Sequence, residues 1–302
     1  MILVDYSSIS IGAVHALHES LVKGTPEEAT DLLRHVILNS LLSIKKKFAK
    51  EYGDIVIAVD NRRYWRKDYF PEYKASRKTD REASDLPWEA IYAAMDDVKD
   101  GLDRFFPYRV VDVEGAEADD VIGTLVHYIR DNVELDRMFD PGPLGMEEGP
   151  PLLIVSADKD FLQLQQFTFV KQYNPQRKQF VRVTPQEALE YLHEHIMRGD
   201  EGDGIPNVRM PNNTFVDHLR QLPITKTLIA QCKSDEGISE ARVRLGFDRN
   251  RTLIDLDRAP MEVKHRIIDA FTNASTKSSR KLIYDYFVSR RLRNLMTSIE
   301  DF

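Results

Sequence analysis

The sequence of 302 residues has a single cysteine, Cys232, and no apolar run of the roughly 18 residues that a membrane span needs. One thiol excludes a disulfide framework and any zinc or iron–sulfur site built from several cysteines. The first residues, MILVDYSSIS, have neither the basic region nor the long apolar stretch of a signal peptide. We therefore expect a cytoplasmic protein that makes no membrane contact.

An overall excess of positive charge is also missing, since 42 Lys and Arg stand against 49 Asp and Glu, a net charge of −7. Such a balance argues at first against a nucleic-acid partner, but the local distribution of charge matters more than the total. Residues 62–81 carry eight Lys or Arg against three acids. The acids must therefore be concentrated in other parts of the chain.

Apolar runs and helix patterns alternate in the first half of the chain. Four short runs are apolar on both faces of a strand, at residues 2–7, 55–60, 108–113 and 152–157. The clearest helix between them covers residues 25–53, with Thr25 as its cap, Pro26 at the first helical position and Gly53 past its end. This alternation predicts an α/β fold, a mostly parallel sheet with helices on both faces.

The pattern becomes helical and more polar from about Thr184 to the C-terminus. We therefore expect an α/β domain at residues 1–183 and a helical region at residues 184–302. Residues 134–151 are rich in Pro, Gly and acids, and we interpret them as a surface loop, because the strand that follows them belongs to the same sheet.

Three carboxylates, Glu117, Asp119 and Asp120, crowd the start of a helix that is otherwise apolar. Capping is the ordinary explanation, since acids complement the positive end of a helix by about 0.3–1 kcal/mol per charge. One or two acids would be enough for that purpose. The crowding has a second explanation if other acids meet these three in space.

Six further acids occupy positions from which they can converge. Asp5 and Asp60 end the first two strands, Asp158 and Asp160 follow the fourth, and a Gly-rich loop adds Asp200 and Asp203. The carboxyl ends of parallel strands form one edge of the sheet, and ligands bind in the crevice there. Each acid taken singly could be a turn or capping residue, but capping does not explain why so many stand at strand ends.

Nine carboxylates in one crevice raise one another's pKa unless cations lie among them. None of the nine positions is a His or Cys, and oxygen ligands suit Mg²⁺, with Mn²⁺ as a substitute, better than zinc. Two such ions about 3.5–4 Å apart support in-line displacement at phosphorus. His193 and His195 lie on different faces of a helix at their i, i+2 spacing, and we expect both at the surface.

The basic segment mixes its charges with aromatic residues. These are Tyr64, Trp65, Tyr69, Phe70 and Tyr73. Such a mixture is typical of surfaces where bases stack and phosphates are held. The alternative is a solvated basic helix whose aromatic side chains face the core. The basic residues that we expect to contact nucleic acid are Arg66, Lys67, Lys74, Arg77 and Lys78.

Five motifs resemble, in order and spacing, those of the flap endonuclease and 5′→3′ exonuclease family. They are VDY at 4–6, AVD at 58–60, EADDVI at 117–122, SADKDFLQL at 156–164 and GDEGDGIPNV at 199–208. The resemblance implies a Mg²⁺-dependent nuclease with two metal ions. The ligands that it implies for the first ion are Asp5, Asp60, Glu117, Asp119, Asp120 and Asp158, and those for the second are Asp160, Asp200 and Asp203.

The segment RRYWRKDYFPEYKASRK and the C-terminal LRNLMTSIEDF resemble the branch of this family found as ribonucleases H in T-even phages. The resemblance implies removal of RNA primers, with RNA–DNA hybrid, flap or duplex DNA bearing a free 5′ end as substrate. It further implies a monomer with a replication single-strand-binding protein as a partner. It places Arg66, Lys74 and Arg77 in an arch over the single strand, and we expect Lys74, Arg77 and Asp158 to be catalytic.

One departure from the family pattern follows the last acidic motif. The stretch VRMPNNTFVDHL lacks the Gly-x-Gly with which relatives grip duplex backbone and bind K⁺, so the sequence does not predict either property there. Two other classes compete with this interpretation. A PIN-type ribonuclease needs fewer acids than the nine present here, and a binding protein with a degenerate site would lack some acids of the five motifs, whereas none is absent.

Overall fold

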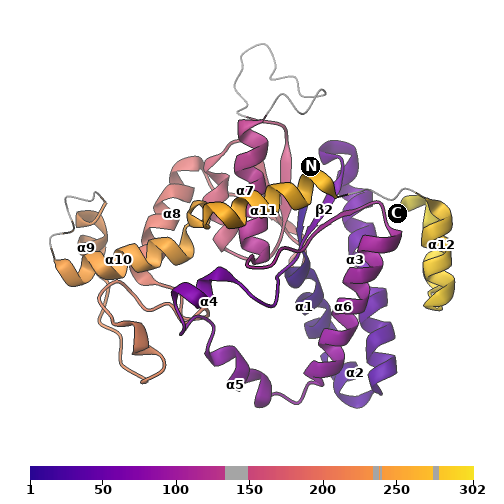
Figure 1. Ribbon diagram of the computed structural model, residues 1–302, viewed down its shortest axis with the longest axis horizontal. Helices are drawn as coiled ribbons and strands as arrows, with labels where there is room; N and C mark the ends of the chain where they lie inside the picture. Colours follow the sequence, from indigo (N-terminus) through magenta and orange to yellow (C-terminus); the bar gives the residue numbers. More distant parts are fainter. Residues whose placement is uncertain (133–148, 234–237, 239, 275–278) are drawn as a thin grey trace, which may run out of the picture.

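The computed structural model describes residues 1–132, 149–233, 238, 240–274 and 279–302. The strands in these residues form one six-stranded sheet, which lies among helices (Figure 1). Its strands lie in the order β3-β2-β1-β4-β5-β6. Their bounds are β1 Ile2–Asp5, β2 Ile55–Ala58, β3 Arg109–Val111, β4 Leu152–Val155, β5 Val170–Asn174 and β6 Gln179–Val181. The first five strands run parallel and β6 is antiparallel to β5. The four predicted strands and the mostly parallel sheet are confirmed.

The sheet is buried on both faces because successive residues of its central strands point to opposite sides. In β1, Ile2 and Val4 join one apolar cluster and Leu3 joins the other. The hairpin of β5 and β6 was missed by the sequence analysis. Its strands carry polar residues such as Gln172 and Asn174, so they lack the apolar run that marked the other four.

Helices cover both faces of the sheet (Figure 1). One face is covered by α1 Tyr6–Ala16, α3 Pro26–Tyr52, α6 Trp88–Phe105 and α12 Arg280–Ser289, and the other by α7 Ala118–Asp131, the 3₁₀ helix η2 Asp160–Gln166 and α11 Met261–Asn273. The predicted helix at 25–53 is confirmed, since Thr25 and Glu28 form a capping box at the start of α3. Residues from the predicted C-terminal region thus complete the core on both sides.

A third apolar cluster lies beside the sheet. It packs α8 Pro185–Arg198, α9 Lys226–Gln231 and α10 Ala241–Ile254 against Phe70 and Tyr73 of the basic segment. The basic segment itself forms α4 Trp65–Tyr69 and α5 Ser76–Glu82, which lead in an arc from the end of β2 to α6 (Figure 1). The arc is therefore anchored at α4 on the same cluster that holds α8.

The remaining helices are short. They are α2 His18–Lys23, η3 Asn212–Thr214, η5 Leu256–Arg258, α13 Arg293–Met296 and η6 Ile299–Asp301. The predicted loop at 134–151 lies mostly outside the described residues, which resume at 149. Among the helices that are described, none combines the length and the apolar character of a membrane span.

Candidate functional site

A cleft of about 700 Å³ opens at the carboxyl ends of β1 and β4, next to the α4–α5 arc. The strand order reverses between these two strands, and this is where ligands bind in open parallel sheets. Six of the nine predicted acids line the cleft, namely Asp5, Asp60, Asp119, Asp158, Asp160 and Asp200. The sheet therefore brings together acids that are far apart in sequence.

Asp5 ends β1 and begins α1. Its carboxylate accepts hydrogen bonds from Ser8 N at 3.0 Å and from Ser156 Oγ at 2.7 Å, which fix its orientation. Burial, reinforced by the negative charge of Asp60, raises the pKa of Asp5 from 3.8 to about 7. A cation beside such a buried carboxylate stabilises its charged form.

Asp60 and Asp119 face Asp5 from the next two segments. Asp60 accepts hydrogen bonds from Ser7 Oγ and from Ala118 N at 2.7 Å, so it joins the end of β2 to the start of α7. Burial, followed by the charge of Asp158, raises the pKa of Asp119 well above its ordinary value. These carboxylates form an all-oxygen group on the β1 side of the cleft.

Asp158 is connected to this group and to a second one by hydrogen bonds. Its backbone N–H donates to Ser156 Oγ, which in turn donates to Asp5, and its Oδ1 accepts from the backbone N–H of Asp160 at 2.9 Å. Gln172, a buried residue of β5, donates to the carbonyl oxygens of Ser156 and of Asp158 itself and so supports the turn after β4. Burial is the main reason for the raised pKa of Asp5 and of Asp160, and the charge of Asp158 adds to both shifts. Asp158 is therefore the acid that couples the two halves of the cleft.

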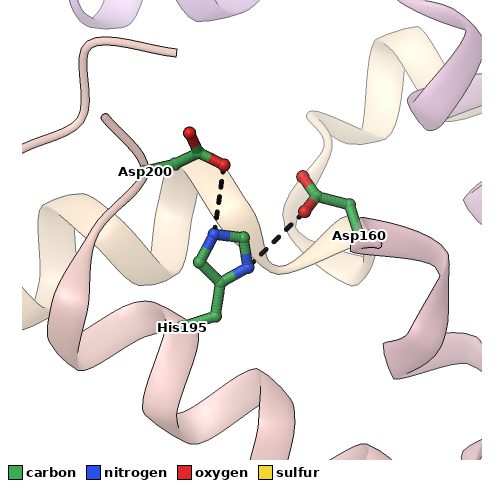
Figure 2. A group of neighbouring side chains, drawn as sticks. All are labelled: Asp160, His195 and Asp200. Atoms are coloured by element: carbon green, nitrogen blue, oxygen red, sulfur yellow. Dashed lines mark hydrogen bonds and ion pairs between the residues drawn. The ribbon is translucent and has the colours of Figure 1, made fainter. Parts of the chain in front are cut away.

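The second group consists of Asp160, Asp200 and His195 (Figure 2). The imidazole lies between the two carboxylates, with Nδ1 at 3.5 Å from Asp160 Oδ1 and Nε2 at 3.2 Å from Asp200 Oδ2. Burial and the charge of Asp158 raise the pKa of Asp160 to about 7, whereas the hydrogen bond from His195 lowers the pKa of Asp200. These three side chains could hold a metal ion together.

The expectation that His195 is a surface residue is wrong. Its side chain is only 11% exposed, because the last turn of α8 packs against η2 and runs directly into the loop that carries Asp200. His193 does lie on another face of α8, where Nε2 contacts the carbonyl oxygen of Ile229 at 3.0 Å. The sequence did contain a signal for this position. His195 lies in the last turn of the helix that ends at Gly199, five residues before Asp200.

The other three predicted acids, Glu117, Asp120 and Asp203, are not among the residues that line the cleft, and each is paired with a cation. Asp120 accepts from Trp65 Nε1, Arg66 and the backbone of Glu117, and it is fully buried. Arg66 also bonds Glu117 at 2.9 Å and the carbonyl oxygen of Leu253. The interpretation of Arg66 as a phosphate contact is corrected, because its guanidinium is 2% exposed and neutralises two buried acids. Glu117 and Asp120 as metal ligands stay a prediction.

Lys74 and Arg77 line the cleft on the arc side. Lys74 Nζ lies 2.6 Å from Glu117 Oε1 and 3.5 Å from Asp203 Oδ2, and Arg77 lies 2.8 Å from Asp203 Oδ1. Tyr73 donates its hydroxyl to Asp203 as well, at 2.8 Å. Asp203 therefore connects the arc to the loop after α8, and both cations belong to the same cleft lining as the acids.

The exposed part of the basic segment is smaller than its composition suggests. Trp65, Phe70 and Tyr73 are buried, as the alternative interpretation had them, while Tyr69 is 49% exposed. Lys67 and Lys78 are exposed, and Lys78 pairs with Glu82 one helical turn away at 3.8 Å. Burial thus withdraws three of the five predicted aromatic residues from base stacking, whereas Arg66 is the one buried residue among the five predicted basic contacts.

The donor atoms of the cleft suit divalent cations. Oxygen ligands dominate. Burial, together with the crowding of negative charge, raises the pKa of Asp5 and of Asp160 to about 7 and that of Asp119 well above its ordinary value. Hard cations such as Mg²⁺ and Mn²⁺ take such carboxylate sets. The residues that would hold them are the six acids of the cleft and, on one side, His195.

This electrostatic crowding has a measurable effect on stability. The unfolded chain releases the Asp5 proton near pH 4, whereas the folded chain keeps it to about pH 7, so the free energy of unfolding falls as the pH rises between these values. In EDTA we expect Asp5→Asn to be more stable than wild type at pH 8, by up to about 4 kcal/mol, with the difference reduced to about 1 kcal/mol at pH 4.5. Thermal melts at both pH values measure this. Equal pH dependence of the two proteins would contradict it.

Comparisons with known proteins agree with this geometry. A family model described as the 5′-3′ exonuclease N-terminal, resolvase-like domain matches residues 1–193, and one described as the C-terminal domain of T4 RNase H matches residues 189–302. The chain is 31% identical over 313 residues to the ribonuclease H of Enterobacteria phage T4, which covers 99% of this chain and 95% of that protein. It is 30% identical to DNA polymerase I of Pseudomonas aeruginosa over 217 residues, 69% of this chain and 20% of the polymerase.

Solved structures share the fold. The phage T5 D15 protein co-crystallised with metal ions superposes with a TM-score of 0.59 at 14% identity, over 91% of this chain and 99% of that one. The T5 D15 flap endonuclease in a complex with DNA and metal ions gives 0.55 at 16% identity, over 90% and 99%. The chain therefore belongs to the 5′–3′ exonuclease family that includes the ribonuclease H of phage T4, and it is a nuclease, a hydrolase of phosphodiester bonds.

Proposed function

We propose that the protein is a 5′→3′ exonuclease and flap nuclease that uses two Mg²⁺ ions, with Mn²⁺ as a substitute, on RNA–DNA hybrid and duplex DNA. Removal of RNA primers during phage lagging-strand replication is the role that this activity suits. The observation that carries the proposal is the division of the cleft into two acidic groups joined by Asp158. A site for one ion needs only one of those groups.

The chain's own residues have separable tasks in this reaction. Two bound ions would supply Lewis-acid polarisation of the phosphate and a more acidic water. The acids of the cleft hold them, with Glu117, Asp120 and Asp203 beside that set. Lys74 and Arg77, which line the cleft, meet the phosphate oxygens where negative charge gathers. The α4–α5 arc stands where a single strand with a free 5′ end would enter.

A labelled RNA–DNA hybrid tests the proposal directly. With Mg²⁺, we expect a hybrid labelled at the 5′ end of its RNA to lose short 5′ products, and the matching DNA duplex to be cut in the same polarity. Streptavidin bound at the 5′ end should suppress cleavage far more than streptavidin at the 3′ end, because the strand must enter from its free end. Equal inhibition from both ends would show a non-polar endonuclease.

Four wider properties belong to the same proposal. We place the protein in the host cytoplasm as a monomer, with a replication single-strand-binding protein as its partner and the region 184–302 as a contact for DNA. The similarity to the ribonuclease H of phage T4 over 95% of that protein supports this placement. Sedimentation of the protein alone tests whether it is a monomer. Sedimentation together with the single-strand-binding protein of the same phage tests whether the two proteins associate.

A further inference from the structure

His195 has two ring nitrogens with different surroundings (Figure 2). Nε2 lies 3.2 Å from Asp200 Oδ2, within hydrogen-bond range. Nδ1 is buried and has no hydrogen-bond partner among the described residues. Asp160 Oδ1 is 3.5 Å from it, too far for a normal hydrogen bond. With the ring proton on Nε2, the lone pair of Nδ1 therefore faces a carboxylate oxygen.

Two electron-rich atoms that face each other in a buried place need a proton or a metal ion between them. Against the effect of burial, the hydrogen bond to Asp200 and the charge of Asp160 raise the pKa of His195, so a metal ion at Nδ1 would take the place of a second ring proton. Ligand atoms each about 2.1 Å from a metal ion lie roughly 3.0 Å apart at a right angle and about 4.2 Å apart when opposite. The separation of 3.5 Å between Nδ1 and Asp160 Oδ1 falls between these limits. It is wider than the right-angle value and close to the roughly 3.4 Å that separates two ligands of a tetrahedral ion, so one ion can bind both atoms.

Asp200 has the position of a carboxylate that orients a metal-binding histidine. Its Oδ2 receives Nε2 of His195, and its Oδ1 receives the backbone N–H of Asp203 at 3.1 Å. Metal-binding imidazoles commonly donate their other N–H to a carboxylate, which sets the tautomer and the direction of the ring. The loop after α8 therefore holds Asp200 where it leaves the lone pair of Nδ1 free.

We propose that Nδ1 of His195 is a ligand of the second metal ion, together with Asp160, and that this position therefore prefers a transition-metal ion to Mg²⁺. The inference rests on the proposed two-ion function. The group around Asp5 is made of oxygen atoms and suits Mg²⁺, whereas an imidazole nitrogen favours ions of the first transition row. The two halves of one cleft would then differ in metal preference.

Pulsed electron paramagnetic resonance of bound Mn²⁺ tests the inference without measuring activity. Metal-free wild-type protein should take up two Mn²⁺, and its spin-echo decay should show the modulation of a directly bound ¹⁴N nucleus. When Mg²⁺ is added in excess, the first Mn²⁺ that it displaces should be the one whose signal lacks the nitrogen modulation. His195→Gln should lose the modulation and bind the second Mn²⁺ at least about tenfold more weakly, with the first ion's affinity within about threefold of wild type.

Two further variants make the result specific. His193→Gln removes an imidazole from the same helix, where Nε2 contacts the carbonyl oxygen of Ile229 and not the cleft, and it should keep both the modulation and the second ion. His195→Asp supplies an oxygen donor instead of nitrogen. It should bind a second ion without the modulation and should shift that position toward Mg²⁺, which also covers the case in which His195→Gln does not fold.

The outcomes separate this inference from the proposed function. Two bound Mn²⁺ without nitrogen modulation in wild type would overturn the role of His195 and leave the two-ion nuclease standing, with His195 as a protonated partner of the two aspartates. One bound Mn²⁺ whose modulation disappears in His195→Gln would support the histidine ligand and overturn the two-ion function. One bound Mn²⁺ without modulation would overturn both.

Discussion

Asp158→Ala is expected to abolish phosphodiester hydrolysis at every Mg²⁺ concentration while nucleic-acid binding stays intact or becomes tighter. Asp158 is connected to both acidic groups by hydrogen bonds, and its charge reaches carboxylates in both. Its loss therefore weakens both metal positions, and the several kcal/mol of charge stabilisation that such ions supply correspond to about 10³-fold or more in rate. Binding survives because one negative charge facing phosphate has been removed.

Single-turnover cleavage and a binding titration in Ca²⁺ measure the two effects separately. Glu201→Ala is the matched control, since it removes the same charge from the exposed part of the nearby loop, and its rate should stay within about threefold of wild type. A tenth of wild-type activity remaining in Asp158→Ala would exclude the assignment of two coupled metal positions.

Lys74→Ala should lower the single-turnover rate by about 10²–10³, the usual cost of one pre-organised contact to a developing charge. The ammonium nitrogen of Lys74 lies 2.6 Å from Glu117 Oε1. The Lys74 side chain is only 10% exposed and lines the cleft. Its pKa is raised, since the attraction of Asp203 and Glu117 outweighs burial, so it stays charged at all working pH values. Alanine is a fair replacement because the backbone φ of 54° strains both residues alike.

Lys78→Ala provides the comparison, because Lys78 belongs to the same segment but is 81% exposed, and its ion-pair partner among the described residues is Glu82. We expect this variant to keep its rate within about threefold and to flatten the salt dependence of binding by about one unit of slope. Glu117 keeps its ion pair with Arg66 in Lys74→Ala, so we expect this variant to fold. Thermal melts check this expectation. A Lys74→Ala rate like that of Lys78→Ala would leave Lys74 as a structural partner of Glu117 and Asp203.

The sequence was sufficient for the sheet and for the acids that follow its strands. Runs such as ILVD are apolar on both faces, so they must be buried strands, and burial on both faces implies a parallel arrangement. An acid at or just beyond the carboxyl end of such a strand, as Asp5 and Asp60 are, then lies at the same edge as its neighbours. The hairpin of β5 and β6 escaped because Gln172 is buried through hydrogen bonds and not through apolarity.

Only the tertiary structure decided how the nine acids divide. Arg66 and Glu117 are 51 residues apart, and no local pattern indicates that this arginine lies under α7 and neutralises Glu117 and Asp120. The same holds for His195, whose position between Asp160 and Asp200 depends on how α8 packs against η2. Sequence spacing along one element determines which side chains share an edge or a face. Which of them meet within 3–4 Å depends on the packing of distant elements, and that distance decides whether a carboxylate faces a metal ion or an arginine.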